Sequence, residues 1–263
     1  MEISVLASGS TGNAVCVRTG ETRILIDGGI STRAITRKLA DIGVDIATLD
    51  AVLVTHEHND HIKGLVTFGK KYDVPVYARY DAWRAMPNVA KAVAQHNRRL
   101  LRDNLEVGDC KIEVFDTSHD AADPVGFSVY WQDRKFSLAT DLGCVSNRVK
   151  NALSVSDFLV FEANHDIDML KDGSYPAFLK RRILGARGHL SNETAGHTLA
   201  DIAREKPYMQ IMLAHLSQEN NRPQLAKTTV EQIMEGAGLK LNEEVAVKVT
   251  SPEQTVSWEI KRM

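Results

Sequence analysis

The chain has 263 residues, of which 43% are hydrophobic, 25% charged and 6% aromatic, and this composition excludes disordered and fibrous proteins. Its 32 Lys and Arg against 34 Asp and Glu give a formal net charge of −2, so no overall positive field favours binding to nucleic acid or to a membrane surface. Attraction to a polyanion must therefore come from local patches or from bound metal.

The first half of the chain alternates short strands with helices. Apolar runs bounded by Gly, Ser and Asn predict strands at 2–6, 14–18, 23–27, 51–55 and 75–78. The spacing of apolar residues predicts helices at 31–42 and 61–72, and a helical stretch at 81–102. Arg98, Arg99 and Arg102 lie close together at the end of that stretch, where they fit either a solvated face or a patch that contacts phosphate.

The second half repeats this order of strands followed by helices. Strands are expected at 111–117, 126–131, 135–140, 157–161, 209–214, 245–249 and 255–260, and helices at 192–205 and 224–236. This order predicts an α/β fold in which two packed sheets carry helices on their outer faces. Because no linker, low-complexity tract or short-period repeat interrupts the chain, we expect one domain over residues 1–263.

The cysteines and the first residues bear on the cellular compartment. Cys16, Cys110 and Cys144 are odd in number and widely spaced, which argues against a disulfide framework and against a structural zinc knuckle and predicts buried free thiols. The opening MEISVLASGS lacks the basic and long apolar regions of a signal peptide, and no apolar run is long enough to span a membrane. We expect a cytoplasmic protein without membrane partners.

The densest polar cluster directly follows the apolar run at 51–54 and reads Thr55-His56-Glu57-His58-Asn59-Asp60-His61. In an extended segment residues two apart point the same way, so His56 and His58 face one point, while Asp60 and His61 can face a second. Three imidazoles and a carboxylate within six residues suit zinc, manganese or iron. The cluster predicts two adjacent metal sites.

Four ligands cannot complete two metal shells, and later strands supply more residues of the same types. His119, Asp141 and His215 each stand at the carboxyl end of an apolar run. Each alone is equally well explained as a capping Asp or as a hydrogen-bonded core His. Together with the first cluster they form a set of seven candidate metal ligands.

The order His56-x-His58-x-Asp60-His61, then His119, Asp141 and His215, resembles the metallo-β-lactamase superfamily over nearly the whole chain. The resemblance implies an αββα sandwich, two packed mixed sheets with helices on the outer faces, and two divalent metal ions per chain, Zn, Mn or Fe. It further implies that His56, His58 and His119 hold one metal and that Asp60, His61 and His215 hold the other. Asp141 would bridge the two.

Shorter segments narrow the resemblance to one group within the superfamily. These are Ser8-Gly9-Ser10-Thr11-Gly12-Asn13 and the segments at 118–126, 161–166, 188–193 and 213–221. In combination they are similar to the YycJ/WalJ group of bacterial metallohydrolases, which are related to tRNase Z and the cyclic phosphodiesterases. The resemblance implies a dinuclear metal-dependent phosphodiesterase or nuclease, with DNA 5′-to-3′ exonuclease activity and DNA ends as its partner.

In such an enzyme a metal-bridging hydroxide, rather than a side chain, would attack phosphorus in line. Asp60 would orient that hydroxide as well as bind metal. The resemblance to tRNase Z-like enzymes makes His189 the candidate general acid and Glu162 its partner. The alternative, that His189 only caps the next helix, is weaker because Ser191 or Asn192 is the better cap.

Several polar residues are candidates for binding the substrate. Ser8, Ser10 and Asn13 offer groups that could cradle a phosphate, although a Gly-rich turn between two strands needs no ligand. His165 fits either a substrate contact or a surface position beside Asp166. We add Asn192 to the expected substrate contacts.

Two other functions stay open at this point. Thiolester hydrolases of the glyoxalase II kind share all seven ligands, so a small-molecule hydrolase acting on a thiolester, lactone or cyclic phosphodiester is the alternative. A non-catalytic metal-binding adaptor is the third, although a catalytic site keeps an open metal position that a structural site closes. The sequence leaves open the native metal, the polarity of degradation and whether the chain forms a homo-oligomer.

Overall fold

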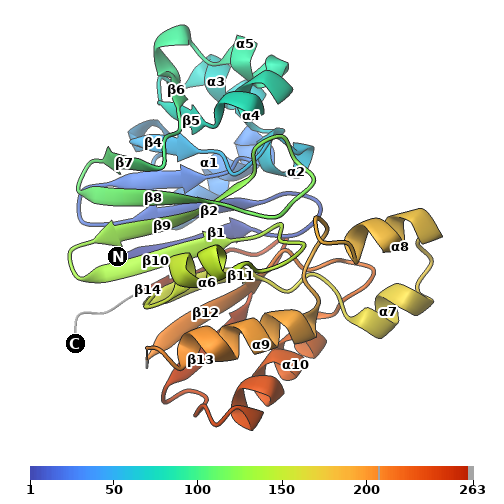
Figure 1. Cartoon of the computed structure of the whole chain (residues 1–263). Helices are drawn as coiled ribbons and strands as arrows, with labels where there is room; N and C mark the ends of the chain where they lie inside the picture. The colour runs from blue at the N-terminus through green and yellow to red at the C-terminus, as the bar shows by residue number, and fades with distance from the viewer. Residues whose placement is uncertain (207, 260–263) are drawn as a thin grey trace. The chain divides into compact units, whose positions relative to one another are not determined.

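The computed structural model describes residues 1–206 and 208–259, and the described strands form two seven-stranded sheets (Figure 1). Contacts within the chain define two compact units. The first unit comprises Met1–Val114, Ala121–Val125 and Ser251–Met263, and the second comprises Phe115–Asp120 and Gly126–Thr250. Within the described residues, none of the helices combines the length and apolarity needed to cross a bilayer.

The first sheet has the strand order β14-β1-β2-β3-β4-β5-β6. Its strands are β1 (Glu2–Ala7), β2 (Ala14–Arg18), β3 (Arg23–Ile26), β4 (Ala51–Leu53), β5 (Val76–Ala78), β6 (Arg98–Leu100) and β14 (Val256–Glu259). Strands β3 to β6 run parallel to one another, so their carboxyl ends share one edge of the sheet. The last predicted strand is present from residue 256, and its expected final residue 260 lies outside the described part.

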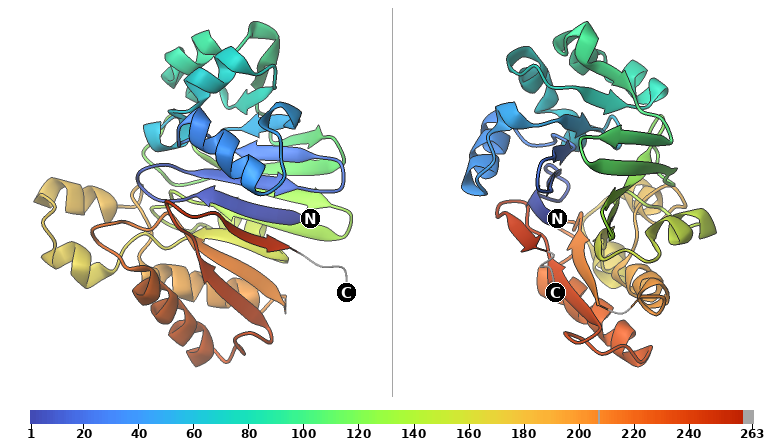
Figure 2. Two further views of the ribbon diagram at one scale, coloured as in Figure 1. Left: turned by 180° about the vertical axis from the view of Figure 1, so that it is seen from behind. Right: turned by 90° about the vertical axis from the view of Figure 1, so that its left-hand side faces the viewer.

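The first unit also contains helices α1 (Thr32–Asp41), α2 (Asn59–Ile62), α3 (Leu65–Lys71), α4 (Tyr80–Ala85) and α5 (Pro87–Ala92), with short 3₁₀ helices at Ile46–Thr48 and Gln95–Asn97. Helix α1 begins where Ser31 Oγ accepts a hydrogen bond from the Ala34 amide. Its buried Ile35 and Leu39 belong to one apolar cluster with Leu25 of the sheet. Figure 2 shows α1 lying over one face of this sheet.

The helix expected at 61–72 is instead two helices, α2 and α3. The carbonyl of Asp60 accepts a hydrogen bond from the Asn13 amide at 2.8 Å, and the Gly64 amide donates to the Gly28 carbonyl at 2.8 Å. The bond from Gly64 to Asp60 that would continue the helix is thereby replaced by bonds to two distant segments, one after β1 and one after β3. The break ties the histidine segment to the turn after β3.

The helical stretch expected at 81–102 is present as α4, α5 and the 3₁₀ helix at Gln95–Asn97, and it is wrong from residue 98. Pro87 starts a second short helix, α5, after α4 has ended, and Arg98–Leu100 forms strand β6 in parallel register with β5. Strand pairing with a distant partner therefore overrides the local helical tendency.

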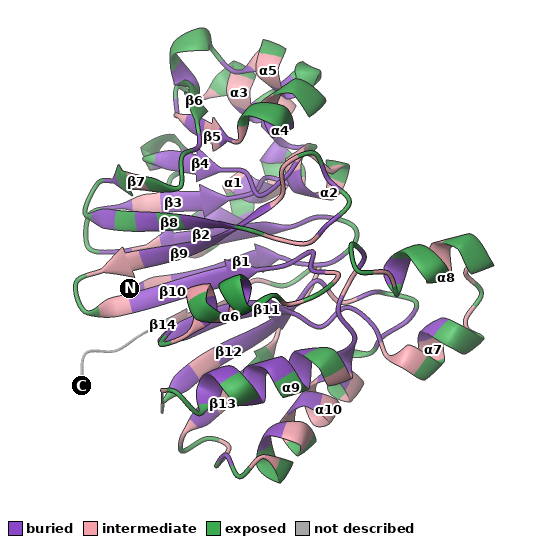
Figure 3. Cartoon of the chain, viewed as in Figure 1, coloured by how far each residue is buried: buried purple, intermediate pink, exposed green. Residues whose placement is uncertain are grey.

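The second sheet has the order β13-β12-β11-β10-β9-β8-β7. Its strands are β7 (Asn104–Val107), β8 (Cys110–Asp116), β9 (Val125–Trp131), β10 (Arg134–Ala139), β11 (Phe158–Glu162), β12 (Met209–Ala214) and β13 (Val245–Val249). Strands β10 to β13 are parallel; β10 to β12 are largely buried, whereas β13 also carries partly and fully exposed residues (Figure 3). The fully buried β11 has a continuous apolar sequence at 158–161. The carboxyl ends of β10 to β13 also share one edge.

The described residues of the second unit also form the helices α6 (Asn147–Leu153), α7 (Ile167–Asp172), α8 (Ala177–Ile183), α9 (Asn192–Ala203) and α10 (Pro223–Gly236). Helices α9 and α10 pack on each other, and their Leu199 and Val230 share an apolar cluster with Ile211 of β12. The sequence analysis missed α6, α7 and α8, although Ser146 and Asp166 cap the first two through side-chain bonds to backbone amides.

The expectation of buried thiols holds for two of the three cysteines. Cys16 and Cys110 are buried, and burial raises the pKa of each thiol to about 12. Cys144 is exposed, so the expectation is wrong at that position. It lies in the loop between β10 and α6.

Candidate metal centre

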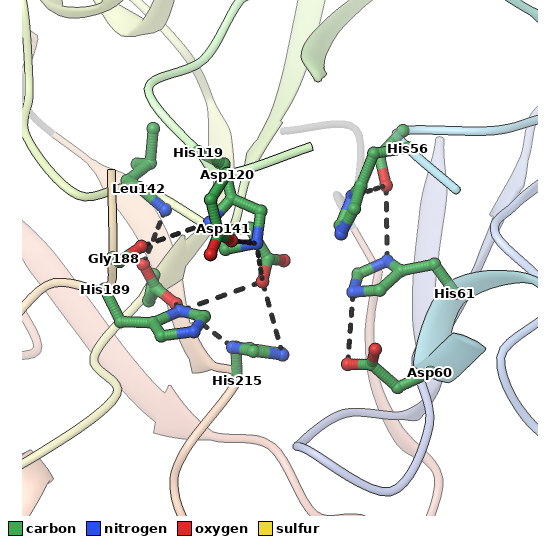
Figure 4. Close-up of polar contacts among 12 residues, drawn as sticks. His56, Asp60, His61, His119, Asp120, Asp141, Leu142, Gly188, His189 and His215 are labelled. Carbon is green, nitrogen blue, oxygen red and sulfur yellow. Dashed lines mark hydrogen bonds and ion pairs between the residues drawn. The ribbon is translucent and has the colours of Figure 1, made fainter. Parts of the chain in front are cut away.

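The histidine loop of the first unit starts at the carboxyl end of β4 and runs into α2. The ring centroid of His56 lies 4.7 Å from that of His58 and 4.1 Å from that of His61. His56 and His61 are buried, and Asp60 and His58 are partly exposed. The three imidazoles therefore lie close together, whereas the spacing predicts His56 and His58 at one point and Asp60 and His61 at a second. Figure 4 shows the rings of His56 and His61 next to each other.

Asp27, which the sequence analysis did not single out, holds this loop in place. Its Oδ2 lies 2.7 Å from His61 Nδ1 and accepts from Thr55 Oγ1 at 2.8 Å, while Oδ1 accepts from the Thr55 amide at 2.8 Å. Because the carboxylate accepts the proton on Nδ1, Nε2 of His61 keeps its lone pair available for a metal. The position of Asp27 directly after the predicted strand at 23–27 is the sequence feature that could have identified it as a site residue.

Asn13 approaches the same loop from the turn after β1. Its Nδ2 lies 3.1 Å from His61 Nε2 and 3.3 Å from Asp60 Oδ2, and its Oδ1 accepts from the Gly9 amide at 3.0 Å. The structure thus gives Asn13 partners among the predicted ligands. Ser8 of this turn is buried and Ser10 is exposed.

Replacing Gly29 with alanine is expected to distort the histidine loop. A Cβ at Gly29 would lie 1.6 Å from the Asp60 carbonyl oxygen and 2.6 Å from the Asn13 nitrogen, so the backbone itself must shift. Overpacking of this kind costs about 2–3 kcal/mol of unfolding free energy. Denaturant titration and metal analysis of Gly29→Ala should show lower stability and less bound metal.

Gly20→Ala is the matched control, because a Cβ there meets nothing within 4 Å. Its unfolding free energy should stay within about 0.5 kcal/mol of the parent. Equal stability and equal metal content in Gly29→Ala and Gly20→Ala would contradict the proposed packing of Gly29 against the loop.

The second unit brings together His119, Asp141 and His215 (Figure 4). Asp141 Oδ1 lies 3.6 Å from Nε2 of His119 and 3.6 Å from Nε2 of His215. Nδ1 of His119 donates to the Gly188 carbonyl at 3.1 Å, and Nδ1 of His215 donates to Glu162 Oε1 at 3.0 Å. In the neutral rings both Nε2 atoms are then acceptors facing a carboxylate oxygen, an arrangement that a cation stabilises.

The backbone at two of these residues adopts an uncommon conformation. Asp141 and His215 have φ values of +60° and +56°, in the left-handed region that side chains other than Gly rarely occupy. Both follow parallel strands of the second sheet, β10 and β12. Such strain persists where the surrounding fold imposes it, and it concentrates at functional sites.

Glu162, at the end of β11, is the fully buried acceptor of this cluster. Its Oε1 accepts from Nδ1 of His189 at 2.8 Å as well as from His215, and its Oε2 accepts from the amides of Leu142 and Leu190. Burial opposes ionisation, but the charge of His189 and these imidazole hydrogen bonds lower the pKa of Glu162 overall. The predicted pair of His189 and Glu162 is therefore in contact.

Helix α9 is capped by Ser191, whose Oγ accepts from the Thr194 amide. His189 is therefore not the cap of that helix.

Burial lowers the pKa of the His119 imidazole below its ordinary value, against the opposing effect of Asp141, and this favours the neutral ring that can bind metal.

His165 and Asn192 also lie in the second unit. His165 is only 1% exposed, so its alternative surface position is wrong. Both of its ring nitrogens are buried without a hydrogen-bond partner within the described residues, and burial lowers its pKa to about 4. Asn192 exchanges side-chain hydrogen bonds with Asn221 at 2.9 and 3.0 Å.

The donor types fit a divalent metal. Each of Asp141, Glu162, His189 and His215 offers a ligand atom within 4.8 Å of those of the others. Imidazole nitrogen and carboxylate oxygen suit zinc, manganese and iron, and the Nδ1 bonds to a carboxylate or carbonyl are the usual support of metal-binding histidines.

Comparison with known proteins agrees with this chemistry. Residues 7–215 match the model of the metallo-beta-lactamase superfamily. The chain is 40% identical over 255 residues to an exodeoxyribonuclease YycJ of Bacillus anthracis, covering 96% of each chain. It is 38% identical over 254 residues to an exodeoxyribonuclease WalJ of Streptococcus pneumoniae, covering 95% of this chain and 94% of the relative.

A solved structure shows the same fold. The metallo-beta-lactamase fold protein YhfI from Bacillus subtilis aligns with a TM-score of 0.72 at 14% identity, covering 98% of this chain and 99% of that one. These similarities confirm the expected α/β fold of two mixed sheets with helices and the expected class of enzyme, a hydrolase. The chain therefore belongs to the metallo-β-lactamase superfamily.

Proposed function

We propose that this protein is a metal-dependent exonuclease that degrades DNA from the 5′ end towards the 3′ end. The observation that carries the proposal is the convergence of His119, Asp141 and His215, which follow the alternate strands β8, β10 and β12, with Nδ1 of both imidazoles already donating elsewhere. Two relatives named exodeoxyribonucleases, similar over nearly the whole chain, support DNA as the substrate.

The proposed metal ligands follow the pattern of the superfamily. His56, His58 and His119 would hold one divalent ion, Asp60, His61 and His215 a second, and Asp141 would contact both. Bound ions of this kind supply a hydroxide nucleophile near neutral pH and neutralise charge on the phosphoryl oxygens. Zinc, manganese and iron all suit these donors.

The residues of the chain itself have distinct proposed roles. Asp60, held beside His61 by Asn13, would orient the attacking water. Glu162 accepts the Nδ1 proton of His189, which leaves Nε2 of the protonated ring to donate to the departing 3′-oxygen. The bond from phosphorus to that oxygen breaks as the bond from phosphorus to the attacking oxygen forms, so a 5′-mononucleotide is released.

Substrate contacts are proposed at Ser8, Ser10 and His165. The two unpartnered ring nitrogens of buried His165 support this role, because such groups are costly unless a ligand or water meets them. The partners found for Asn13 and Asn192 favour a positioning role, in which they hold the groups that meet the substrate.

We also propose that the chain acts as one domain, since the superfamily match at 7–215 runs through both compact units. A cytoplasmic location is proposed because the relatives named exodeoxyribonucleases come from bacteria, whose DNA lies in the cytoplasm. DNA ends are the proposed partner.

A substrate panel tests this function against the small-molecule alternative. Protein loaded with manganese or zinc is incubated with single-stranded DNA, with bis(p-nitrophenyl) phosphate and with S-lactoylglutathione. We expect chelator-sensitive hydrolysis of the two phosphodiesters. Turnover of the thiolester with both phosphodiesters left intact would contradict the proposal.

A further inference from the structure

An open hollow of about 570 Å³ lies on the first unit beside β6, the edge strand of the first sheet among the described residues. Its lining includes Tyr80, Trp83, Arg84, Arg98, Arg99 and Leu100. Tyr80 is 64% exposed and Leu100 54%, which is unusual for such large side chains. Figure 3 shows exposed residues over most of α4 and β6.

The chemistry of this hollow combines cations with aromatic rings. Among the described residues three arginines line it and no carboxylate does. One of the three, Arg84, also lies 3.4 Å from Oδ1 of Asp81. The Arg84 guanidinium carbon lies 5.9 Å from the centroid of the Tyr80 ring, and Trp83 Nε1 donates to the Arg99 carbonyl at 2.9 Å, which fixes the indole against the strand. Exposed rings beside arginines are the features that bind single-stranded nucleic acid without sequence preference.

The strand register places this hollow near the histidine loop of the same unit. Leu53 of β4 pairs with Tyr77 of β5, which pairs with Arg99 of β6, and all three strands are parallel. His56 follows β4 at the same edge of the sheet at which Tyr80 follows β5. Two inter-strand spacings are roughly 10 Å, a distance that a few nucleotides of single strand can span.

We propose that the hollow binds the single-stranded part of the DNA substrate a few nucleotides from the phosphate that is cleaved. Arg98 and Arg99 contact phosphates, and a base stacks on Tyr80. This inference rests on the proposed nuclease function. A peptide could instead pair with the exposed edge of β6, but the guanidinium groups of Arg98 and Arg99, with no carboxylate among the described lining residues, favour a polyanion over a peptide.

The test measures binding of a fluorescent oligothymidylate to the metal-loaded protein at several salt concentrations. Arg98→Ala/Arg99→Ala should raise the Kd about tenfold or more and reduce the slope of log K against log salt by about 1.4, the value for two lost phosphate contacts on a single strand. The hydrogen bond from Trp83 Nε1 is kept in this double variant because its acceptor is the backbone carbonyl of Arg99. Tyr80→Ala should raise the Kd about tenfold without changing the slope, and Tyr80→Phe should restore affinity.

Arg33→Ala/Arg37→Ala is the matched control, since it removes the same charge from exposed positions of α1 in the same unit. The inference would be overturned if Arg98→Ala/Arg99→Ala bound DNA as tightly as this control. A change of oligomeric state in Arg98→Ala/Arg99→Ala, with DNA binding unchanged, would also overturn it. Hydrolysis of bis(p-nitrophenyl) phosphate, which is too small to reach the hollow, should be unchanged in both variants. Absence of that hydrolysis in the parent protein would count against the nuclease function. The comparison of DNA binding between the two double variants tests separately whether the hollow binds DNA.

Discussion

His189→Ala is expected to lower kcat for DNA cleavage by about 10³-fold while leaving the metal content unchanged. In the structure Nδ1 of His189 is held by Glu162 at 2.8 Å, and the ring is partly exposed, as a group that meets substrate must be. The loss should fall on kcat rather than KM, because the proton is needed only as the 3′-oxygen departs. Single-turnover cleavage and metal analysis of the same samples measure both quantities.

The leaving group provides a sharper check of this role. p-Nitrophenolate departs without a proton, so hydrolysis of bis(p-nitrophenyl) phosphate by His189→Ala should fall by much less than cleavage of DNA. His197→Ala, which removes an exposed imidazole from α9, is the control and should match the parent. Metal loss from His189→Ala, or equal losses on both substrates, would make His189 a metal ligand instead of the general acid.

Asp141→Asn is expected to remove bound metal and to lower the hydrolysis of both phosphodiesters by at least about 10³-fold. Asparagine tolerates the left-handed backbone of Asp141, so the change removes the negative charge with little added strain. Without that charge, Nε2 of His119 and Nε2 of His215 no longer share an anionic partner at 3.6 Å.

The matched control for this change is Asp116→Asn. Asp116 ends β8 in an exposed ion pair with Arg148, a contact worth about 1 kcal/mol or less, so its metal content and activity should stay at parent levels. Inductively coupled plasma mass spectrometry gives the metal per chain. Full metal occupancy in Asp141→Asn would rule out Asp141 as a ligand.

The main elements of the site could be predicted from sequence because they obey local rules. The histidine cluster follows an apolar strand, and Asp141 and His215 follow others, so each candidate is marked by its place at a strand end. Parallel strands bring such ends to one edge. The pairing of His189 with Glu162 came instead from a family resemblance, and the structure supplies the contact.

The residues that support the site could not be predicted in the same way. Asp27 reaches His61 only because β3 pairs with β4, and Glu162 accepts hydrogen bonds from three separate segments of the chain. The division of the expected helix at 61–72 depends likewise on Asn13, some fifty residues earlier. These contacts join residues far apart in the chain, and the local spacing of apolar residues does not predict them.

Degradation of end-labelled DNA tests the central claim most directly. Metal-loaded protein is incubated with strands labelled at the 5′ or the 3′ end, with and without chelator, beside Asp141→Asn. We predict that 5′-labelled mononucleotide appears at the earliest times while the 3′-labelled strand shortens progressively, and that chelator and the substitution both stop the reaction. Intact DNA with manganese and with zinc, or release of the 3′ label first, would contradict a metal-dependent 5′-to-3′ exonuclease.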